Sequence, residues 1–73
     1  MIKYKFDILD ALKTAGYNTT KLRREKLLGE GTLSKLRADG YISLDSINTV
    51  CSLLQCQPGD ILAYIPDDQH KDT

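Results

Sequence analysis

The sequence predicts an all-α, compact five-helix domain with short extended segments at its two ends. Apolar residues recur at steps of three and four along most of the chain, which is the spacing of one helix face. Residues that begin or end helices stand at the borders of these segments. The segments near the two ends, in which apolar and polar residues alternate, are too short to form a sheet alone. A chain of 73 residues has room for one small domain.

The first helix is expected to begin near Phe6, because Phe6, Leu9 and Leu12 fall on one helical face. Acidic residues occupy its first turns, where the helix dipole favours negative charge. Gly16 stands where a helix end is expected. Before this helix, the apolar and polar residues of the stretch IKYKF alternate, which is the period of a strand.

A second helix is expected to follow Asn18 or Thr19, since either side chain can cap it, with Leu22 on its inner face. The two glycines of the stretch LLGEG then indicate a turn. We expect Gly29 to be the flexible point of that turn.

A third helix, at roughly residues 30–38, has two inward anchors, Leu33 and Leu36, and we expect its other positions to face outward. Ser43 can cap a fourth helix. The apolar stripe of this helix is expected to hold Leu44, Ile47, Val50, Cys51, Leu53 and Leu54.

Pro58 suits the first turn of a short fifth helix, and Pro66 ends the structured part of the chain. The extended ends, IKYK and AYI, could pair as an antiparallel ribbon packed on a helix, but the sequence leaves this pairing open. We therefore expect one domain over residues 1–66 and a polar, disordered tail at residues 67–73.

The formal net charge is zero, yet the charges are unevenly distributed. Residues 1–40 hold nine Lys or Arg against five Asp or Glu, whereas residues 41–73 hold one Lys against five Asp. A chain with a basic half and an acidic half can present a basic face to a partner despite its total.

Composition excludes several classes of protein. The sequence contains no run of about 18 apolar residues that could form a membrane span, and its first residues lack the apolar stretch of a signal peptide. We therefore expect a cytoplasmic protein. Cys51 and Cys56 do not match a metal-ligand spacing and are expected to be buried and reduced.

An enzyme is not expected. The one histidine, His70, lies in the tail, and no nucleophile–base pair or phosphate-binding glycine motif is present. We expect no cofactor, no metal and no small-molecule ligand.

The second and third helices, joined by a tight connection, have the pattern of a helix-turn-helix. In that motif the later helix lies in the major groove of DNA and the earlier one crosses the backbone. Lys35 can bond guanine, Ser34 can meet several bases, and Ala38 can touch a thymine methyl group. The alternative is a surface helix whose polar residues face only water.

The sequence also resembles a known family, the Cro/CI-type (XRE-like) helix-turn-helix regulators of bacteria and their phages. The resemblance covers about residues 2–66 and rests most on the stretches TLSKLR at 32–37, SLDSINTVCSLLQCQPGDIL at 43–62 and YIPD at 64–67. It implies a lambda-repressor-like DNA-binding domain and a role in transcription regulation.

The motif and the resemblance together predict two sets of DNA contacts. The base contacts are Glu30, Gly31, Thr32, Ser34, Lys35 and Ala38. The phosphate contacts are Thr19, Thr20, Lys21, Arg24, Arg37, Tyr41 and Ser43. The role of Glu30 stays open, because its carboxylate can accept a bond from cytosine N4 or stabilise the helix N-terminus electrostatically.

We expect the partner to be double-stranded DNA, bound by a repressor-like regulator at two half-sites. A homodimer, free or formed on DNA, is possible through Tyr64, Ile65 or the edge of the IKYK segment. The rival hypothesis is a protein-interaction module of the same fold, antitoxin-like or an anti-repressor, with weak or no DNA binding.

Overall fold

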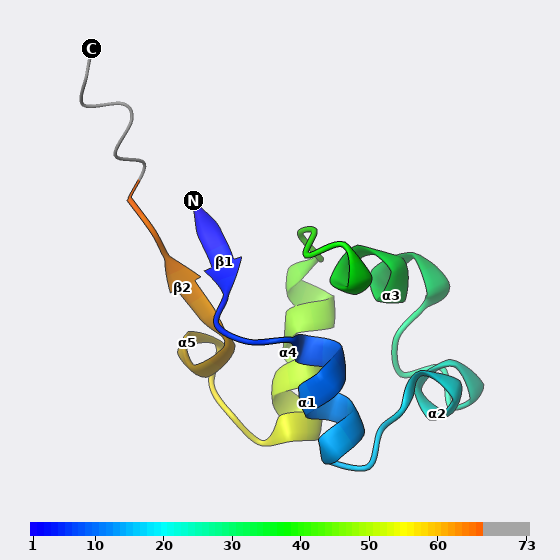
Figure 1. Cartoon of the computed structure of the whole chain (residues 1–73). Helices are drawn as coiled ribbons and strands as arrows, with labels where there is room; N and C mark the ends of the chain where they lie inside the picture. Colours follow the sequence, from blue (N-terminus) through cyan, green and yellow to red (C-terminus); the bar gives the residue numbers. More distant parts are fainter. Residues whose placement is uncertain (67–73) are drawn as a thin grey trace.

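The structure, a computed structural model, describes residues 1–66 and consists of five helices and a two-stranded ribbon (Figure 1). The polar tail predicted at residues 67–73 lies outside the described residues. In chain order the elements are β1 Ile2–Tyr4, α1 Ile8–Thr14, α2 Thr19–Arg24, α3 Glu30–Arg37, α4 Leu44–Leu54, α5 Pro58–Ile61 and β2 Leu62–Tyr64.

Helix α1 begins two residues later than expected. The Asp7 carboxylate accepts a bond from the Asp10 N–H at 3.1 Å and thereby caps the helix. Phe6 therefore stands before the helix and is 44% exposed, so its predicted place on the inner face is wrong. The buried residues of α1 are Ile8 and Leu12, and Gly16 ends the helix at φ 101° as predicted.

The turn between α2 and α3 bends at a different residue from the one predicted. Lys26 takes the left-handed conformation at φ 57°, and its N–H bonds the Arg23 carbonyl at 3.1 Å. The N–H of Leu27 bonds the Leu22 carbonyl at 2.9 Å, which completes a Schellman-type helix end. Gly29 has an ordinary extended backbone and is the N-cap of α3, so its predicted role as the flexible point is wrong.

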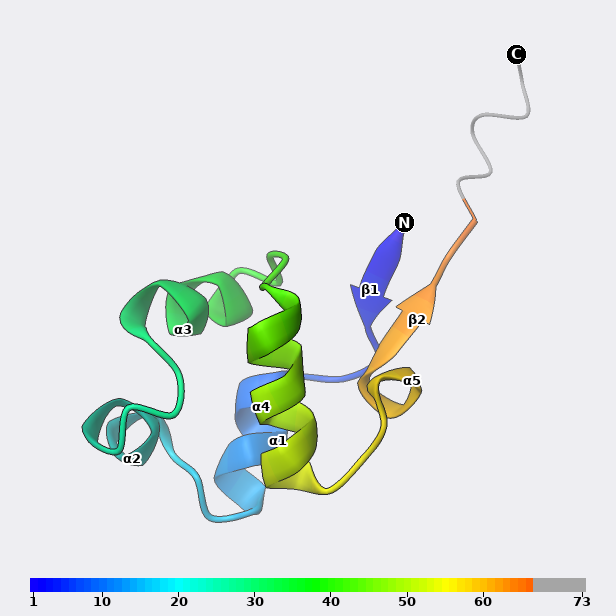
Figure 2. The ribbon, with the colours of Figure 1, turned by 180° about the vertical axis from the view of Figure 1, so that it is seen from behind.

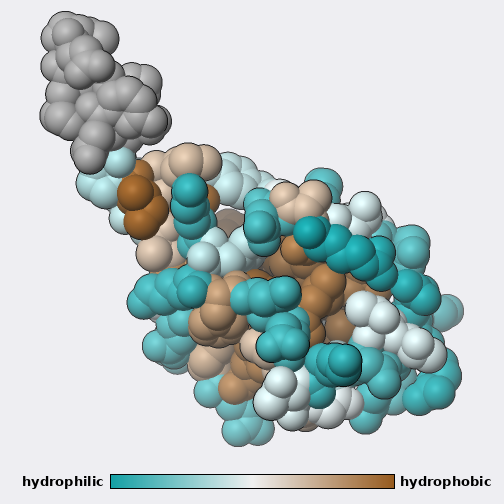
Figure 3. All heavy atoms as spheres, viewed as in Figure 1, coloured by the Kyte–Doolittle hydropathy of each residue, from teal (hydrophilic) through white to brown (hydrophobic). Residues whose placement is uncertain are grey.

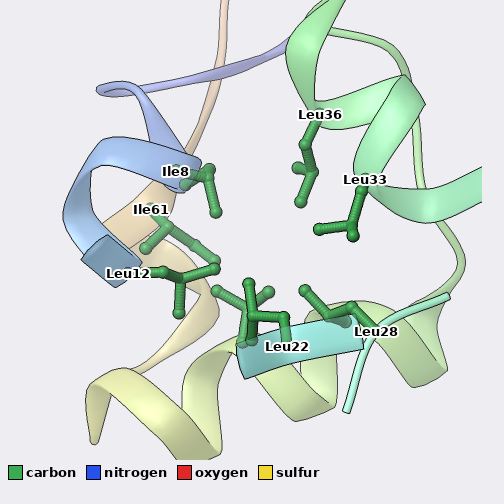
Figure 4. Close-up of a cluster of buried hydrophobic side chains, with 8 residues drawn as sticks. Ile8, Leu12, Leu22, Leu28, Leu33, Leu36 and Ile61 are labelled. Atoms are coloured by element: carbon green, nitrogen blue, oxygen red, sulfur yellow. The ribbon is translucent and has the colours of Figure 1, made fainter. Parts of the chain in front are cut away.

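One hydrophobic core joins all five helices (Figure 4). Its buried members are Ile8, Leu12, Leu22, Leu28, Leu33, Leu36, Val50 and Ile61. The two α3 anchors predicted from the sequence, Leu33 and Leu36, are 0% and 5% exposed. Burying one such side chain contributes about 1.5–3 kcal/mol, so two of them can hold a short helix against its neighbours.

Helix α4 is capped by Ser43, whose hydroxyl accepts a bond from the Ser46 N–H at 3.1 Å, as predicted. Ile47 and Val50 are buried, but Leu44 is 85% exposed and its predicted place in the stripe is wrong. Leu44 is the first residue of the helix and lines a surface groove with Ile2 and Tyr41 instead of entering the core. The free Cys51 is half-buried rather than buried, and so is Cys56.

The two chain ends pair as an antiparallel ribbon, which answers the question that the sequence left open. Its register sets Ile2 opposite Tyr64, Lys3 opposite Ala63 and Tyr4 opposite Leu62. Tyr4 and Leu62 pack on the helical core, which supports a pair too short to be stable alone. The fold is therefore mostly helical with a small sheet rather than all-α, and Figure 2 shows the ribbon set apart from α2 and α3.

Candidate nucleic-acid interface

Helices α2 and α3 follow one another around a short turn and lie at the opposite side of the molecule from the ribbon (Figures 1 and 2). Leu28 fixes this turn because it is 3% exposed and belongs to the core. The sequence pattern did not indicate a core position for Leu28, because the glycine on its C-terminal side interrupts the helical period. The arrangement is that of a helix-turn-helix.

One stripe of α3 faces solvent directly opposite its anchors. Gly31, Ser34, Lys35 and Ala38 stand at steps of three and four along the helix and its C-cap, and all four are exposed. The buried anchors lie on the opposite side of the same helix. Four of the six predicted base-contact positions therefore share one accessible surface.

Thr32 lies on the flank of α3 that meets α4. Its side chain is half-buried, and its hydroxyl oxygen is 3.3 Å from the Ser46 hydroxyl. The expectation that every position other than the two anchors faces outward is thus wrong for Thr32, because α4 packs against this flank. Its contact with a base remains a prediction, and it requires the hydroxyl to leave Ser46.

Glu30 lies on the flank of α3 that faces α2. Its Oε1 is 2.5 Å from Nε of Arg23, while the two side chains remain 67% and 46% exposed. Glu30 is the first residue of α3, where the helix dipole also stabilises its negative charge. This ion pair was not predictable from the sequence, because it spans the turn and depends on how the two helices pack.

The start of α2 holds three of the predicted phosphate contacts. Asn18 caps the helix by accepting a bond from the Lys21 N–H at 2.8 Å, which occupies that donor. The Lys21 ammonium lies 5.2 Å from the centre of the Tyr17 ring, a cation–π contact that holds it beside the helix start. Thr20 is exposed and Thr19 is half-buried.

The loop after α3 is fastened to the ribbon. The Tyr4 hydroxyl donates to the Gly40 carbonyl at 2.6 Å, a contact between residues 36 positions apart. Burial raises the pKa of Tyr4 above its ordinary value, and the nearby Asp39 carboxylate adds to the effect. Tyr41, a predicted phosphate contact in this loop, is 62% exposed.

Ser43 closes the same loop and already has a structural partner. Besides capping α4, its hydroxyl donates to the Ser46 hydroxyl at 3.1 Å. A phosphate contact through Ser43 would therefore compete with the bond to Ser46. Arg24 and Arg37, the remaining predicted phosphate contacts, have exposed side chains on α2 and α3.

Two of the grooves in the described part of the chain bear on the argument, and both lie away from α3. One, of about 600 Å³, runs along α4 and is lined by both cysteines. Burial raises the pKa of the Cys56 thiol there, with contributions from Cys51 and Asp60. The other, of about 320 Å³, is mainly apolar and is lined by Ile2, Tyr41 and Leu44 among others.

The described part of the chain therefore brings most predicted contacts to one side of the molecule. Figure 3 shows predominantly hydrophilic residues at the right, where α2 and α3 lie, and apolar residues on the ribbon. Sequence reasoning missed the residues that position these contacts: Tyr4, Tyr17, Arg23 and Ser46. Their roles depend on contacts between elements, which a periodic pattern does not encode.

Comparison with known proteins identifies the domain. A family model described as the Cro/C1-type HTH DNA-binding domain matches residues 7–67, nearly the whole chain. No curated protein and no solved structure shows a significant match to the chain. Among residues 1–66, no helix has the length and apolar character needed to span a membrane.

Proposed function

We propose that the chain, which belongs to the Cro/C1-type HTH DNA-binding domain family, is a sequence-specific, repressor-like regulator that reads double-stranded DNA with α3. The observation that carries this proposal is the exposed stripe of α3 opposite two buried leucines. Because the core fixes the back of the helix, its front can enter the major groove with little reorganisation.

Base readout in this proposal centres on the middle of the stripe. Lys35 bonds guanine O6 or N7, Ser34 bonds a neighbouring base, and Ala38 contacts a thymine methyl group. Gly31 contributes only its backbone. Thr32 takes part only if its hydroxyl exchanges Ser46 for a base.

Phosphate contacts flank this stripe and set the orientation of the domain. We assign them to the start of α2, to two arginines and to the loop after α3. The residues are Thr19, Thr20, Lys21, Arg24, Arg37, Tyr41 and Ser43. Together they would hold the DNA backbone on both sides of α3.

The salt dependence of DNA binding tests this function. Affinity for a selected duplex should fall steeply with salt, by about 0.9 log units per phosphate contact for each log unit of salt. Lys35→Ala should cost about 1–3 kcal/mol and relax the preference at one base pair. Arg24→Ala should weaken binding to all sequences alike and reduce the salt slope.

The outcomes against this proposal are definite. If the chain does not bind any labelled duplex at low salt, the function is wrong. If Lys35→Ala leaves affinity and base preference unchanged, DNA can still be the partner, but the assignment of Lys35 is wrong.

A homodimer would allow two copies of α3 to read two half-sites. We place its interface at the open edge of β2. The Ile65 N–H bonds the Met1 carbonyl at 2.7 Å, and the Lys5 N–H bonds the Ile61 carbonyl at 2.9 Å. Because antiparallel strands alternate bonded and unbonded residues, Tyr64 directs its N–H and carbonyl away from β1.

The rival function, binding of a protein partner by the same fold, is favoured by one observation. Leu44 and Tyr41 are 85% and 62% exposed beside the apolar groove. A protein partner seated in that groove would bind with a weak salt dependence, whereas DNA binding weakens strongly with salt. The salt experiment therefore separates the two functions.

A further inference from the structure

We propose that Arg23 is a positioning residue that holds the Glu30 carboxylate for reading a cytosine, which is one of the two roles that the sequence leaves open for Glu30. The inference rests on the proposed function, because it assigns a base to the helix that we place in the major groove. It starts from the ion pair between α2 and α3, in which Arg23 Nε and Glu30 Oε1 are 2.5 Å apart.

An acid at the start of a helix that enters DNA needs compensation. Phosphates repel a free carboxylate, and Glu30 is the first residue of α3. The Arg23 guanidinium supplies a permanent positive charge and a rigid, planar donor. Paired in this way, Glu30 can enter the groove without a net negative charge at that point.

The pairing involves one of the two carboxylate oxygens. The ion pair joins Oε1 of Glu30 to Arg23, and 67% of the Glu30 side chain remains exposed. In this proposal, Oε2 is the oxygen that accepts from a donor in the groove. Cytosine presents a donor in the major groove, its N4 amino group, and has no acceptor of its own beside it. A carboxylate can accept a hydrogen bond from this amino group.

Glu30 is well placed to read an edge of the site rather than its centre. It shares a flank with Ser34 and Arg37, which stand four and seven positions later on α3. A contact by Glu30 would therefore specify a base pair next to those read by Ser34 and Lys35. Its partner Arg23 is less exposed, at 46%, which suits a supporting side chain.

The test is a selection of bound duplexes from a random pool, followed by affinity measurements on variants of the selected site. The unaltered chain should prefer cytosine about 5- to 10-fold at one position of each half-site. Glu30→Gln should shift that preference to adenine, because a carboxamide both donates and accepts. Arg23→Ala should reduce the cytosine preference at that position to about twofold, while the base preferences at the other positions of the half-site stay unchanged.

Two further variants separate positioning from a simple phosphate contact. Arg23→Lys keeps a positive partner for Glu30 and should restore part of the cytosine preference. Arg24→Ala removes the neighbouring arginine and should lower affinity for all sequences equally. In Glu30→Gln, adding Arg23→Ala should change the base preference no further, since the ion pair is already lost.

Each contrary outcome has a separate meaning. If the protein binds DNA but Glu30→Gln keeps the same base preference, this inference is overturned and the proposed function stands. If Arg23→Ala lowers affinity for every sequence alike, Arg23 is a phosphate contact and its positioning role is wrong. If the unaltered chain binds no DNA, both the function and this inference fail.

Discussion

Lys26 carries a backbone conformation that glycine adopts far more readily. Its φ of 57° lies in the left-handed region, as do those of Asp39 and Gln55 at other helix ends. A residue with a Cβ atom costs roughly 1–2 kcal/mol in this region. Aspartate bonds its local backbone and tolerates the region better, so Lys26 and Gln55 are the more costly positions.

We predict that Lys26→Gly increases the free energy of unfolding by about 0.5–1 kcal/mol. The substitution removes the left-handed penalty, and the greater freedom of glycine in the unfolded chain offsets part of the gain. Urea denaturation measures the change. Arg24→Gly is the matched control: Arg24 is the last residue of α2, whose backbone is helical, so glycine should destabilise the protein by up to about 1 kcal/mol there. Equal effects of the two variants would show that Lys26 carries no such penalty.

Because of Tyr4, we expect the free energy of unfolding to fall at alkaline pH. The folded chain raises the pKa of this phenol above its ordinary value, through burial and then Asp39. Its protonated form is thus favoured on folding. The stability that it contributes is complete below about pH 10 and is lost as the pH rises through the folded pKa. The hydroxyl must be protonated to donate to the Gly40 carbonyl.

Tyr4→Phe should lower the free energy of unfolding by about 1 kcal/mol at neutral pH, the typical value of one hydrogen bond. It should also remove the part of the alkaline loss that is due to this group. Tyr64→Phe, at a ribbon position that is 66% exposed, is the control and should leave stability at neutral pH unchanged. An alkaline loss of the same size in Tyr4→Phe and the unaltered protein would contradict this account.

At the scale of elements, the N-cap of α4 has both a structural and a predicted functional role. Ser43 caps the helix through Ser46, and it also lies in the loop that we expect to face phosphate. A variant without the Ser43 hydroxyl would lose the cap and the phosphate contact together, and losing an N-cap costs about 0.5–2 kcal/mol of stability by itself. A substitution that keeps the cap is needed.

Ser43→Asp provides this separation. Aspartate caps helices as well as serine does, so the free energy of unfolding should stay within about 0.5 kcal/mol. The added negative charge should repel phosphate and weaken DNA binding at low salt by about tenfold. Gln57→Asp places the same charge at the N-cap of α5, away from α3, and should affect DNA binding much less. Equal losses in the two variants would remove the loop from the interface.

The elements themselves were largely predictable, and the reasons are local. The prediction of Asn18 or Thr19 as a cap succeeded at Asn18 because that signal needs only neighbouring residues. The exposure of Leu44 was not predictable, because a stripe does not reveal where its packing partners end. The same holds for the candidate site: periodicity places Ser34 and Lys35 opposite the two anchors, where the structure has them exposed, but it cannot show that Arg23 pairs with Glu30.

At the scale of the whole molecule, the two edges of the ribbon differ in charge. The edge of β1 is flanked by Lys3 and Lys5, and lysines on an edge strand hinder pairing with another strand. The edge of β2 carries Ala63, Tyr64 and Ile65, which bear no charge at neutral pH, and the last two are 66% and 46% exposed. Within residues 1–66, the β2 edge thus lacks the lysines that flank the edge of β1.

A second copy can pair at this edge around a two-fold axis. Tyr64 of each copy would exchange N–H and carbonyl bonds with Tyr64 of the other, and Ile65 would lie opposite Ala63. Pro66 lacks an N–H, and the Leu62 N–H already bonds the Pro58 carbonyl, so the ladder is short. So short a ladder buries far less than the roughly 1,200–2,000 Å² of a stable interface. We therefore expect a weak dimer that forms mainly on DNA with two half-sites, where the effective concentration is high.

Tyr64→Lys tests this interface, because it sets like charges against each other at the two-fold axis and replaces a side chain that is exposed in the monomer. Sedimentation with a two-half-site duplex should show two copies bound cooperatively for the unaltered chain and independent binding for the variant. Leu44→Lys is the matched control at another exposed apolar residue and should keep cooperativity. If Leu44→Lys removes cooperativity and Tyr64→Lys does not, the dimer forms at the apolar groove beside α4. If the unaltered chain binds both half-sites independently, a dimer through the ribbon is excluded.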